Sequence, residues 1–136
     1  MTASARHRHG RRKAGLAHGP GDTGYRVAGR LWIEKGDETY LSWGRVVLLE
    51  RIAKHGSISA AARSMEMGYR HAWELVDVMN RQAPTPLIEK AAGGVKGGGA
   101  RLTPAGEAAI AEFWRLVRDF QTWLARQRVR AARGRR

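Results

Sequence analysis

Residues 56–80, GSISAAARSMEMGYRHAWELVDVMN, decide the fold of this chain. The stretch contains two helical patterns separated by a short break at residues 65–68. The first pattern, at 59–65, is rich in alanine, and small side chains allow a second helix to cross at close range. Two helices joined by about three or four residues are typical of a helix-turn-helix, so we expect that motif here.

The second helix of the pair is predicted to run from Tyr69 to about Gln82 and to end before Pro84. Its apolar residues recur at the spacing of a single helical stripe. We expect Trp73 in the core because it lies in the middle of that stripe, whereas Tyr69 lies at its edge. The stripe consists of Tyr69, Ala72, Trp73, Val76 and Met79.

The segment before the pair predicts a β-hairpin and a support helix. Apolar and other residues alternate along 27–34, which is the period of a strand. A turn at 35–38 then leads into a short return strand at 39–41. A helical apolar pattern follows from Ser42, a candidate N-cap, and ends at Gly56.

The segment after the pair predicts a wing. Two short strands, at 87–91 and 100–102, flank the loop Gly93–Gly99, which holds five glycines and Lys96. A basic, glycine-rich hairpin directly after a recognition helix is the arrangement of a winged helix. We therefore predict a mainly α fold with small β elements, a winged helix-turn-helix with an N-terminal β-hairpin.

A long helix is predicted from 104 to about 130, with Thr103 as N-cap and Pro104 in its first turn. Its apolar residues are spaced three and four apart, which is a heptad seam for a partner helix. We expect this seam to form a homodimer, with packing on the chain's own core as the alternative. The seam residues are Ile110, Phe113, Val117, Phe120 and Leu124.

Positive charge is concentrated at the two ends of the chain. The net charge is +13, and residues 126–136 alone contain six arginines and no acid, while 1–24 contain five basic residues and one acid. Residues 1–24 have too few large apolar side chains to fold and are predicted to be a disordered basic tail. The expected organisation is therefore tail 1–24, DNA-binding domain 25–103, dimerisation helix 104–130 and tail 131–136.

Several classes of protein are disfavoured. The chain has no cysteine, which excludes disulfide scaffolds and thiolate metal sites. It lacks an apolar run near the ~18 residues of a membrane helix, and its basic N-terminus has no secretory apolar region. We expect a cytoplasmic, nucleoid-associated protein that is not an enzyme, has no membrane partner, and uses no metal or cofactor.

The chemistry of DNA recognition points to particular side chains. Arg70 and His71 lie in the first turn of the predicted recognition helix, and Arg70 is suited to a bidentate contact with guanine. The alternative is a surface ion pair with Glu74, which could itself accept from cytosine or orient Arg70. In the wing, Lys96 and Arg101 are candidates for phosphate contacts. The full set of candidates is Ser57, Ser59, Arg63, Tyr69, Arg70, His71, Glu74, Lys96 and Arg101.

These motifs together resemble the N-terminal domain of the molybdate-responsive regulator (ModE) family, and more broadly the LysR-type winged helix. The resemblance covers about residues 25–125 and implies a dimeric transcription regulator that binds double-stranded DNA. In that family C-terminal domains sense molybdate, and we expect a stand-alone DNA-binding half without a molybdate site. The matching motifs are Gly56–Ala62, Tyr69–Trp73, Asp77, Met79–Asn80, Gly93–Thr103 and the Leu102–Gly106 signature LTPAG.

Two other functions stay open at this point. The basic tails fit a nucleoid-type or RNA-binding protein that is held mainly by charge. A small-molecule or oxyanion sensor is a further alternative, although no convergent polar set is visible in the sequence.

Overall fold

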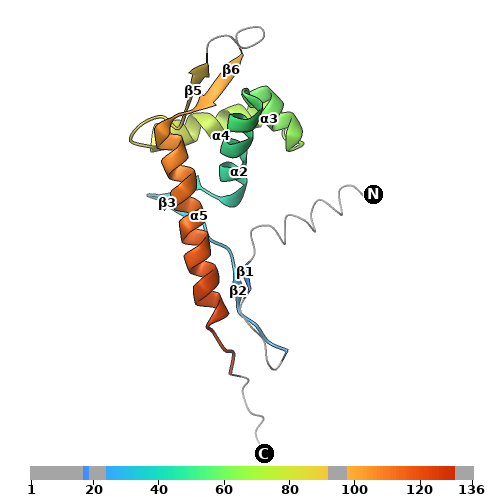
Figure 1. The fold of residues 1–136 in the computed structure, drawn as a ribbon, viewed down its shortest axis with the longest axis vertical. Helices are drawn as coiled ribbons and strands as arrows, with labels where there is room; N and C mark the ends of the chain where they lie inside the picture. The colour runs from blue at the N-terminus through green and yellow to red at the C-terminus, as the bar shows by residue number, and fades with distance from the viewer. Residues whose placement is uncertain (1–16, 19–23, 92–97, 131–136) are drawn as a thin grey trace, which may run out of the picture. The chain divides into compact units, whose positions relative to one another are not determined.

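The computed structural model describes residues 17–18, 24–91 and 98–130 (Figure 1). The chain divides into two compact units. The larger is Trp32–Trp114, and the smaller combines Met1–Leu31 with Arg115–Arg136. The division falls inside the long C-terminal helix rather than at its start, because Phe113 and Trp114 belong to the packing of the larger unit.

The larger unit begins with the predicted β-hairpin. Strands β3 (Ile33–Lys35) and β4 (Glu38–Leu41) pair antiparallel. Gly36 takes a φ of 62° in the turn, a left-handed value that glycine adopts without steric cost. The predicted first strand was too long, because Ala28–Gly29 forms a separate strand outside this hairpin.

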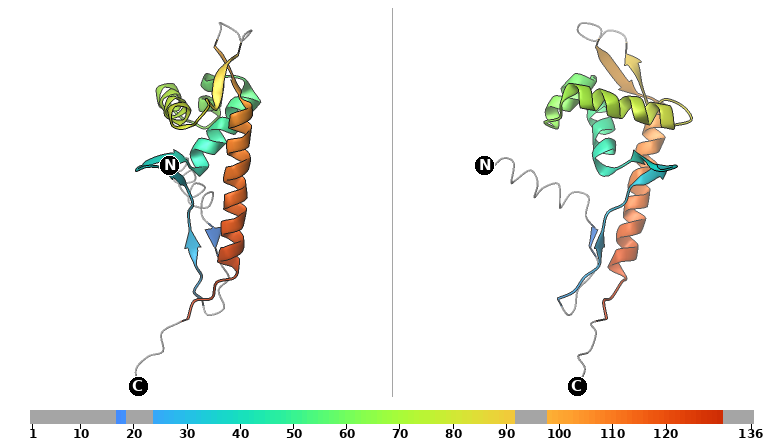
Figure 2. Two further views of the ribbon diagram at one scale, coloured as in Figure 1. Left: turned by 90° about the vertical axis from the view of Figure 1, so that its left-hand side faces the viewer. Right: turned by 180° about the vertical axis from the view of Figure 1, so that it is seen from behind.

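The three helices of the motif follow within one residue of the predicted boundaries. They are α2 (Trp43–His55), α3 (Ile58–Ser64) and α4 (Tyr69–Gln82). Ser42 caps α2 by accepting from the Arg45 amide, and Gly56 ends α2 at a φ of 77°. Ser57 caps α3 by accepting from the Ala60 amide at 3.0 Å. Helix α4 lies crosswise to α2 (Figure 2).

The two wing strands are β5 (Ile88–Ala91) and β6 (Gly99–Leu102), which pair antiparallel beyond α4. Thr103 then caps α5 (Pro104–Ala125) by accepting from the Gly106 amide at 3.0 Å. A Cβ at Gly106 would collide with the Leu87 carbonyl oxygen and the Leu102 side chain. The LTPAG signature therefore needs its glycine because the wing strands and α5 meet there.

Helix α5 ends at Ala125, short of the predicted end near 130. Arg126, Arg128 and Arg130 follow with no acidic residue among them. Continuing the helix would place like charges on adjacent turns, which is unfavourable.

The core of the larger unit joins α2, α3 and α4 to the start of α5. Trp114 makes an edge contact with Trp43, with ring centroids 4.7 Å apart, and its indole N–H donates to Glu50 at 2.9 Å. The fully buried large side chains of this unit are Leu41, Val46, Leu48, Leu49, Ile52, Met79, Leu87 and Phe113.

In the smaller unit, strand β1 (Ala17–His18) pairs antiparallel with β2 (Ala28–Gly29). The predicted disorder of residues 1–24 is therefore wrong at 17–18, and the rest of that tail up to residue 23 lies outside the described residues, as does the tail from 131. Gly29 lies against the Phe120 ring, since a Cβ there would be 3.0 Å from Phe120 Cζ. The absence of a side chain thus allows the strand to approach α5 closely.

Candidate nucleic-acid interface

The recognition helix is fixed at its C-terminal end by Asn80. The Asn80 Oδ1 atom accepts from the amides of Leu87 (2.8 Å) and Ile88 (3.1 Å), and Nδ2 donates to the Ile88 carbonyl at 3.0 Å. One side chain thus connects α4 to the first wing strand and sets their relative position.

The β3–β4 hairpin holds the same end of α4. Lys35 Nζ donates to the Gln82 carbonyl at 2.8 Å, and Gln82 Nε2 donates to the Thr39 carbonyl at 3.0 Å. Arg45 Nη1 also donates to Thr39, at 2.7 Å. Burial lowers the pKa of Arg45, and the nearby Glu38 carboxylate partly opposes this. The hairpin therefore braces the recognition helix.

The buried face of α4 differs from the predicted stripe. Ala72, Val76 and Met79 are buried, whereas Tyr69 is 54% exposed and Trp73 is 42% exposed. The prediction of Trp73 as a core residue is wrong. Leu75, three residues after Ala72, is more covered than Trp73, so the stripe turns away from Tyr69 and Trp73.

The exposed face of α4 carries most of the predicted contacts. Arg70, His71 and Glu74 are all exposed, as are Tyr69 and Trp73. Among the ion pairs of the described residues, Asp77 pairs with Arg81 at 3.3 Å on this helix, and none joins Arg70 to Glu74. The alternative of a surface ion pair between Arg70 and Glu74 is not observed. The Arg70 guanidinium therefore faces solvent in the first turn of α4.

The predicted residues of α3 are engaged with each other or with the backbone. Ser57 caps the helix, and Arg63 Nη1 donates to Ser59 Oγ at 3.0 Å. The Arg63 side chain is exposed, so its remaining N–H groups are open to solvent.

The wing is joined directly to the start of the motif, because the Ala100 amide donates to the Gly56 carbonyl at 2.9 Å. On its exposed surface, Arg101 pairs with Glu89 of the opposite strand at 3.0 Å. A phosphate contact by Arg101 would therefore compete with an existing partner. Lys96 and the loop 92–97 lie outside the described residues.

The sequence reasoning missed three residues that build this interface. Asn80 was visible only as part of a motif, and nothing in its spacing indicated that it binds the wing. A second apolar stripe on the same helix predicts that Trp73 is exposed to solvent. It consists of Ala72, Leu75, Val76 and Met79. Lys90, exposed on β5, is a basic residue of the wing that was not singled out.

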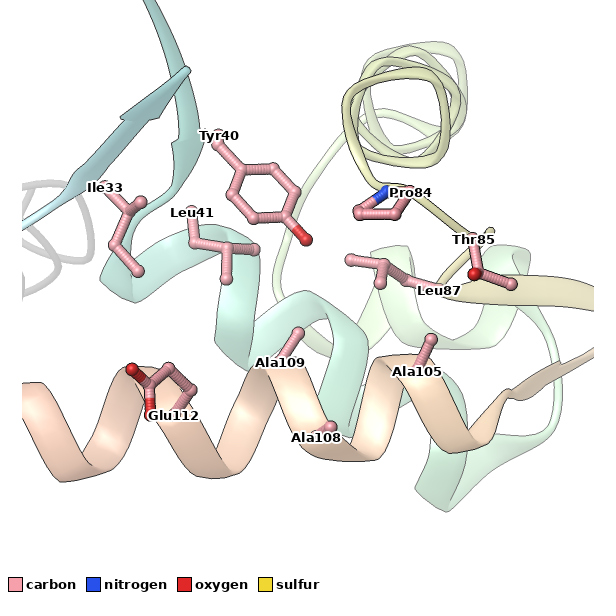
Figure 3. A pocket seen from close by; sticks show the side chains of 10 residues that line it. All are labelled: Ile33, Tyr40, Leu41, Pro84, Thr85, Leu87, Ala105, Ala108, Ala109 and Glu112. Carbon is pink, nitrogen blue, oxygen red and sulfur yellow. The ribbon is translucent and has the colours of Figure 1, made fainter.

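An open apolar cavity of about 340 Å³ lies in the same unit, between the hairpin, the α4–β5 connection and α5 (Figure 3). Figure 3 shows the Tyr40 ring on one side and the small side chains of Ala105 and Ala109 on the other. Burial raises the pKa of the Tyr40 hydroxyl. The lining contains no basic side chain, so the cavity is poorly suited to an oxyanion.

Other kinds of site are not apparent in the described part of the chain. Within it, no group of three or more His, Asp or Glu side chains is placed to hold a metal ion. Over the same residues, no helix is long and apolar enough to cross a membrane.

The helix pair, the two-stranded wing and the capped α5 together define a winged helix-turn-helix domain. Residues 43–107 match the family described as "Bacterial regulatory helix-turn-helix protein, lysR family". These residues therefore form a LysR-type helix-turn-helix domain, as the sequence motifs predicted.

The chain is also similar in sequence to individual curated proteins. The chain is 38% identical over 104 residues to "Molybdenum transport protein ModE" of Azotobacter vinelandii, covering 76% of this chain and 38% of the relative. It is 49% identical over 69 residues to "Molybdenum-pterin-binding protein MopA" of Rhodobacter capsulatus, covering 51% of this chain and 26% of the relative.

A third relative is "DNA-binding transcriptional dual regulator ModE" of Escherichia coli strain K12, which is 42% identical over 77 residues. That match covers 57% of this chain and 29% of the relative. The chain thus spans well under half the length of these relatives.

Proposed function

We propose that this chain is a sequence-specific, double-stranded DNA-binding transcriptional regulator and not an enzyme. The observation that carries the proposal is the exposed face of α4, which presents Arg70, His71 and Trp73 from a helix that Asn80 connects to the wing. In a helix-turn-helix the second helix enters the major groove with its N-terminal residues toward the bases. Such a regulator works in the cytoplasm, at the nucleoid.

In this proposal Arg70 contacts a guanine, because a guanidinium can donate two hydrogen bonds to O6 and N7. Arg63, Lys90 and Arg101 contact phosphates on either side, with Ser57, Ser59 and Tyr69 as polar neighbours of the backbone. The wing loop Gly93–Gly99, with Lys96, follows the backbone next to the groove. Phosphate contacts position the domain, and base contacts give it specificity.

We further propose a homodimer formed through α5. Three residues of the predicted seam, Phe113, Val117 and Leu124, are 0%, 8% and 1% exposed within the single chain. These side chains are already buried within the single chain, so a partner helix could bury little more of their surface. Trp123, which is 54% exposed and stacked on Phe120 with ring centroids 6.3 Å apart, is the better candidate for the contact.

The names of several relatives refer to molybdenum. The matched part is a minority of each of those proteins, 38% and 26% of their lengths. We propose no molybdate site in this chain.

The arginines of 126–136 favour a second candidate function, a nucleoid-type or RNA-binding protein held mainly by charge. Deletion of this tail separates the two functions. Removal of this tail would abolish binding by a charge-held protein, whereas the regulator would keep its preferred sequence and bind all DNA more weakly.

The deciding experiment is selection of bound double-stranded DNA from a random pool, with the full chain at physiological salt. A regulator should enrich one sequence with two half-sites separated by about one helical turn, ~34 Å. Titration of that sequence against scrambled DNA then measures the preference. Equal affinity for both would overturn the proposal.

A further inference from the structure

Two of the large aromatic side chains that the described residues leave exposed lie on the recognition helix. Tyr69 and Trp73 are four residues apart on α4, and residues at this spacing are neighbours on one face of a helix. Contiguous apolar surface on an otherwise polar element marks a site that meets another molecule. The pair is therefore part of what α4 presents to its ligand.

Trp73 faces the same side as Arg70, because residues three apart also share a helix face. Ala72, Val76 and Met79 are buried on the side of the helix away from Arg70, and Trp73 lies between that side and Arg70. Among the hydrogen bonds and ring contacts of the described residues, none engages the Trp73 indole or the Arg70 guanidinium. Both groups are therefore available to a ligand from adjacent positions.

We propose that Trp73 is a specificity-determining residue that contacts the C5-methyl group of a thymine in the major groove. This inference rests on the proposed function. The thymine methyl is the one apolar group that the base pairs display in that groove, and apolar side chains recognise it. The exposed indole of Trp73 provides such a surface beside the hydrogen-bonding groups of Arg70.

The geometry also places this thymine relative to the guanine. Trp73 lies three residues beyond Arg70, which is about 4.5 Å along the helix at ~1.5 Å per residue. Successive bases on one strand are separated by ~3.4 Å. Each half-site should therefore contain a thymine one or two base steps from the guanine that Arg70 contacts.

The test replaces each thymine of the selected sequence in turn with deoxyuridine, which removes only the methyl group. Affinity is measured by fluorescence anisotropy with the full chain. At one thymine per half-site, wild-type affinity should fall roughly three- to fivefold, the effect of losing one methyl-sized apolar contact. Trp73→Ala should bind the thymine and uracil forms of that site equally.

A matched control is Trp32→Ala, since Trp32 is another tryptophan of the larger unit, 52% exposed and hydrogen-bonded to Glu34. It should keep the wild-type preference for thymine. Trp73→Phe, which keeps an apolar ring, should retain part of that preference, and circular dichroism checks that each variant is folded.

The inference is wrong if the selected sequence has no thymine at this place, if wild type is indifferent to every uracil substitution, or if Trp73→Ala keeps the preference at the same thymine. These results leave the regulator proposal intact, because the selected sequence would still be preferred over scrambled DNA. Loss of that preference in wild type would overturn the regulator proposal itself.

Discussion

Helices α4 and α5 both carry aromatic residues at helical spacing, and the fold uses them in opposite ways. On α4 the large rings of Tyr69 and Trp73 are exposed while Ala72, Val76 and Met79 are buried. On α5, Phe113 is fully buried against the core while Trp123 stays exposed. The spacing of apolar residues predicted both helices. Which of their aromatic side chains are buried depends on the elements that pack against each helix face.

The largest expected effect tests the buried side of this comparison. Phe113→Ala removes a fully buried ring and should lower the free energy of unfolding by about 3–5 kcal/mol, the usual range for such a truncation. Urea denaturation followed by circular dichroism measures it. Trp73→Ala is the matched control and should lose far less stability because its ring is partly solvated. Equal losses of unfolding free energy in the two variants would contradict the distinction between a buried ring on α5 and an exposed ring on α4.

The anchor of α4 should give the next effect. Asn80→Ala leaves the Leu87 and Ile88 amides without their side-chain acceptor, which should cost about 1–3 kcal/mol of stability and weaken DNA binding. Asn80→Asp keeps the acceptor and loses only the donor to Ile88, so its stability should lie between wild type and the alanine variant. An alanine variant as stable as wild type would show that the wing does not depend on this connection.

The exposed side of α4 is tested by Arg70→Ala, expected to reduce discrimination at one base pair by about 1–3 kcal/mol. Competition binding between the selected sequence and single-base variants measures this. Arg81→Ala is the control on the same helix, since Arg81 already pairs with Asp77 at 3.3 Å. The assignment fails if both variants lose the same affinity for every sequence.

The smallest effect on stability concerns the exposed aromatic of α5. Trp123→Ala should change the free energy of unfolding by less than about 1 kcal/mol, as expected for a largely exposed site. In sedimentation equilibrium it should nevertheless shift the chain from dimer toward monomer. A variant that dimerises as wild type does would show that Trp123 is not part of the dimer contact.

The candidate site could be predicted in part. The first-turn position of Arg70 and His71 followed from the spacing and the breaks in the sequence, and the structure leaves both side chains exposed. The partner of Arg101 could not be predicted. Arg101 meets Glu89, and this pair depends on the register of two strands that the sequence does not fix.

The sequence by itself determined the helices of this protein, although not the pairing of β1 with β2. Ser42, Ser57, Thr103 and Gly56 have local roles at helix ends, and local hydrogen bonds and backbone preferences suffice to predict them. Tertiary structure decided which faces of those helices are buried. The exposure of Trp73, the burial of Phe113 and the connection of Asn80 to the wing all depend on residues distant in sequence, because burial is a property of neighbouring elements and not of a helix alone.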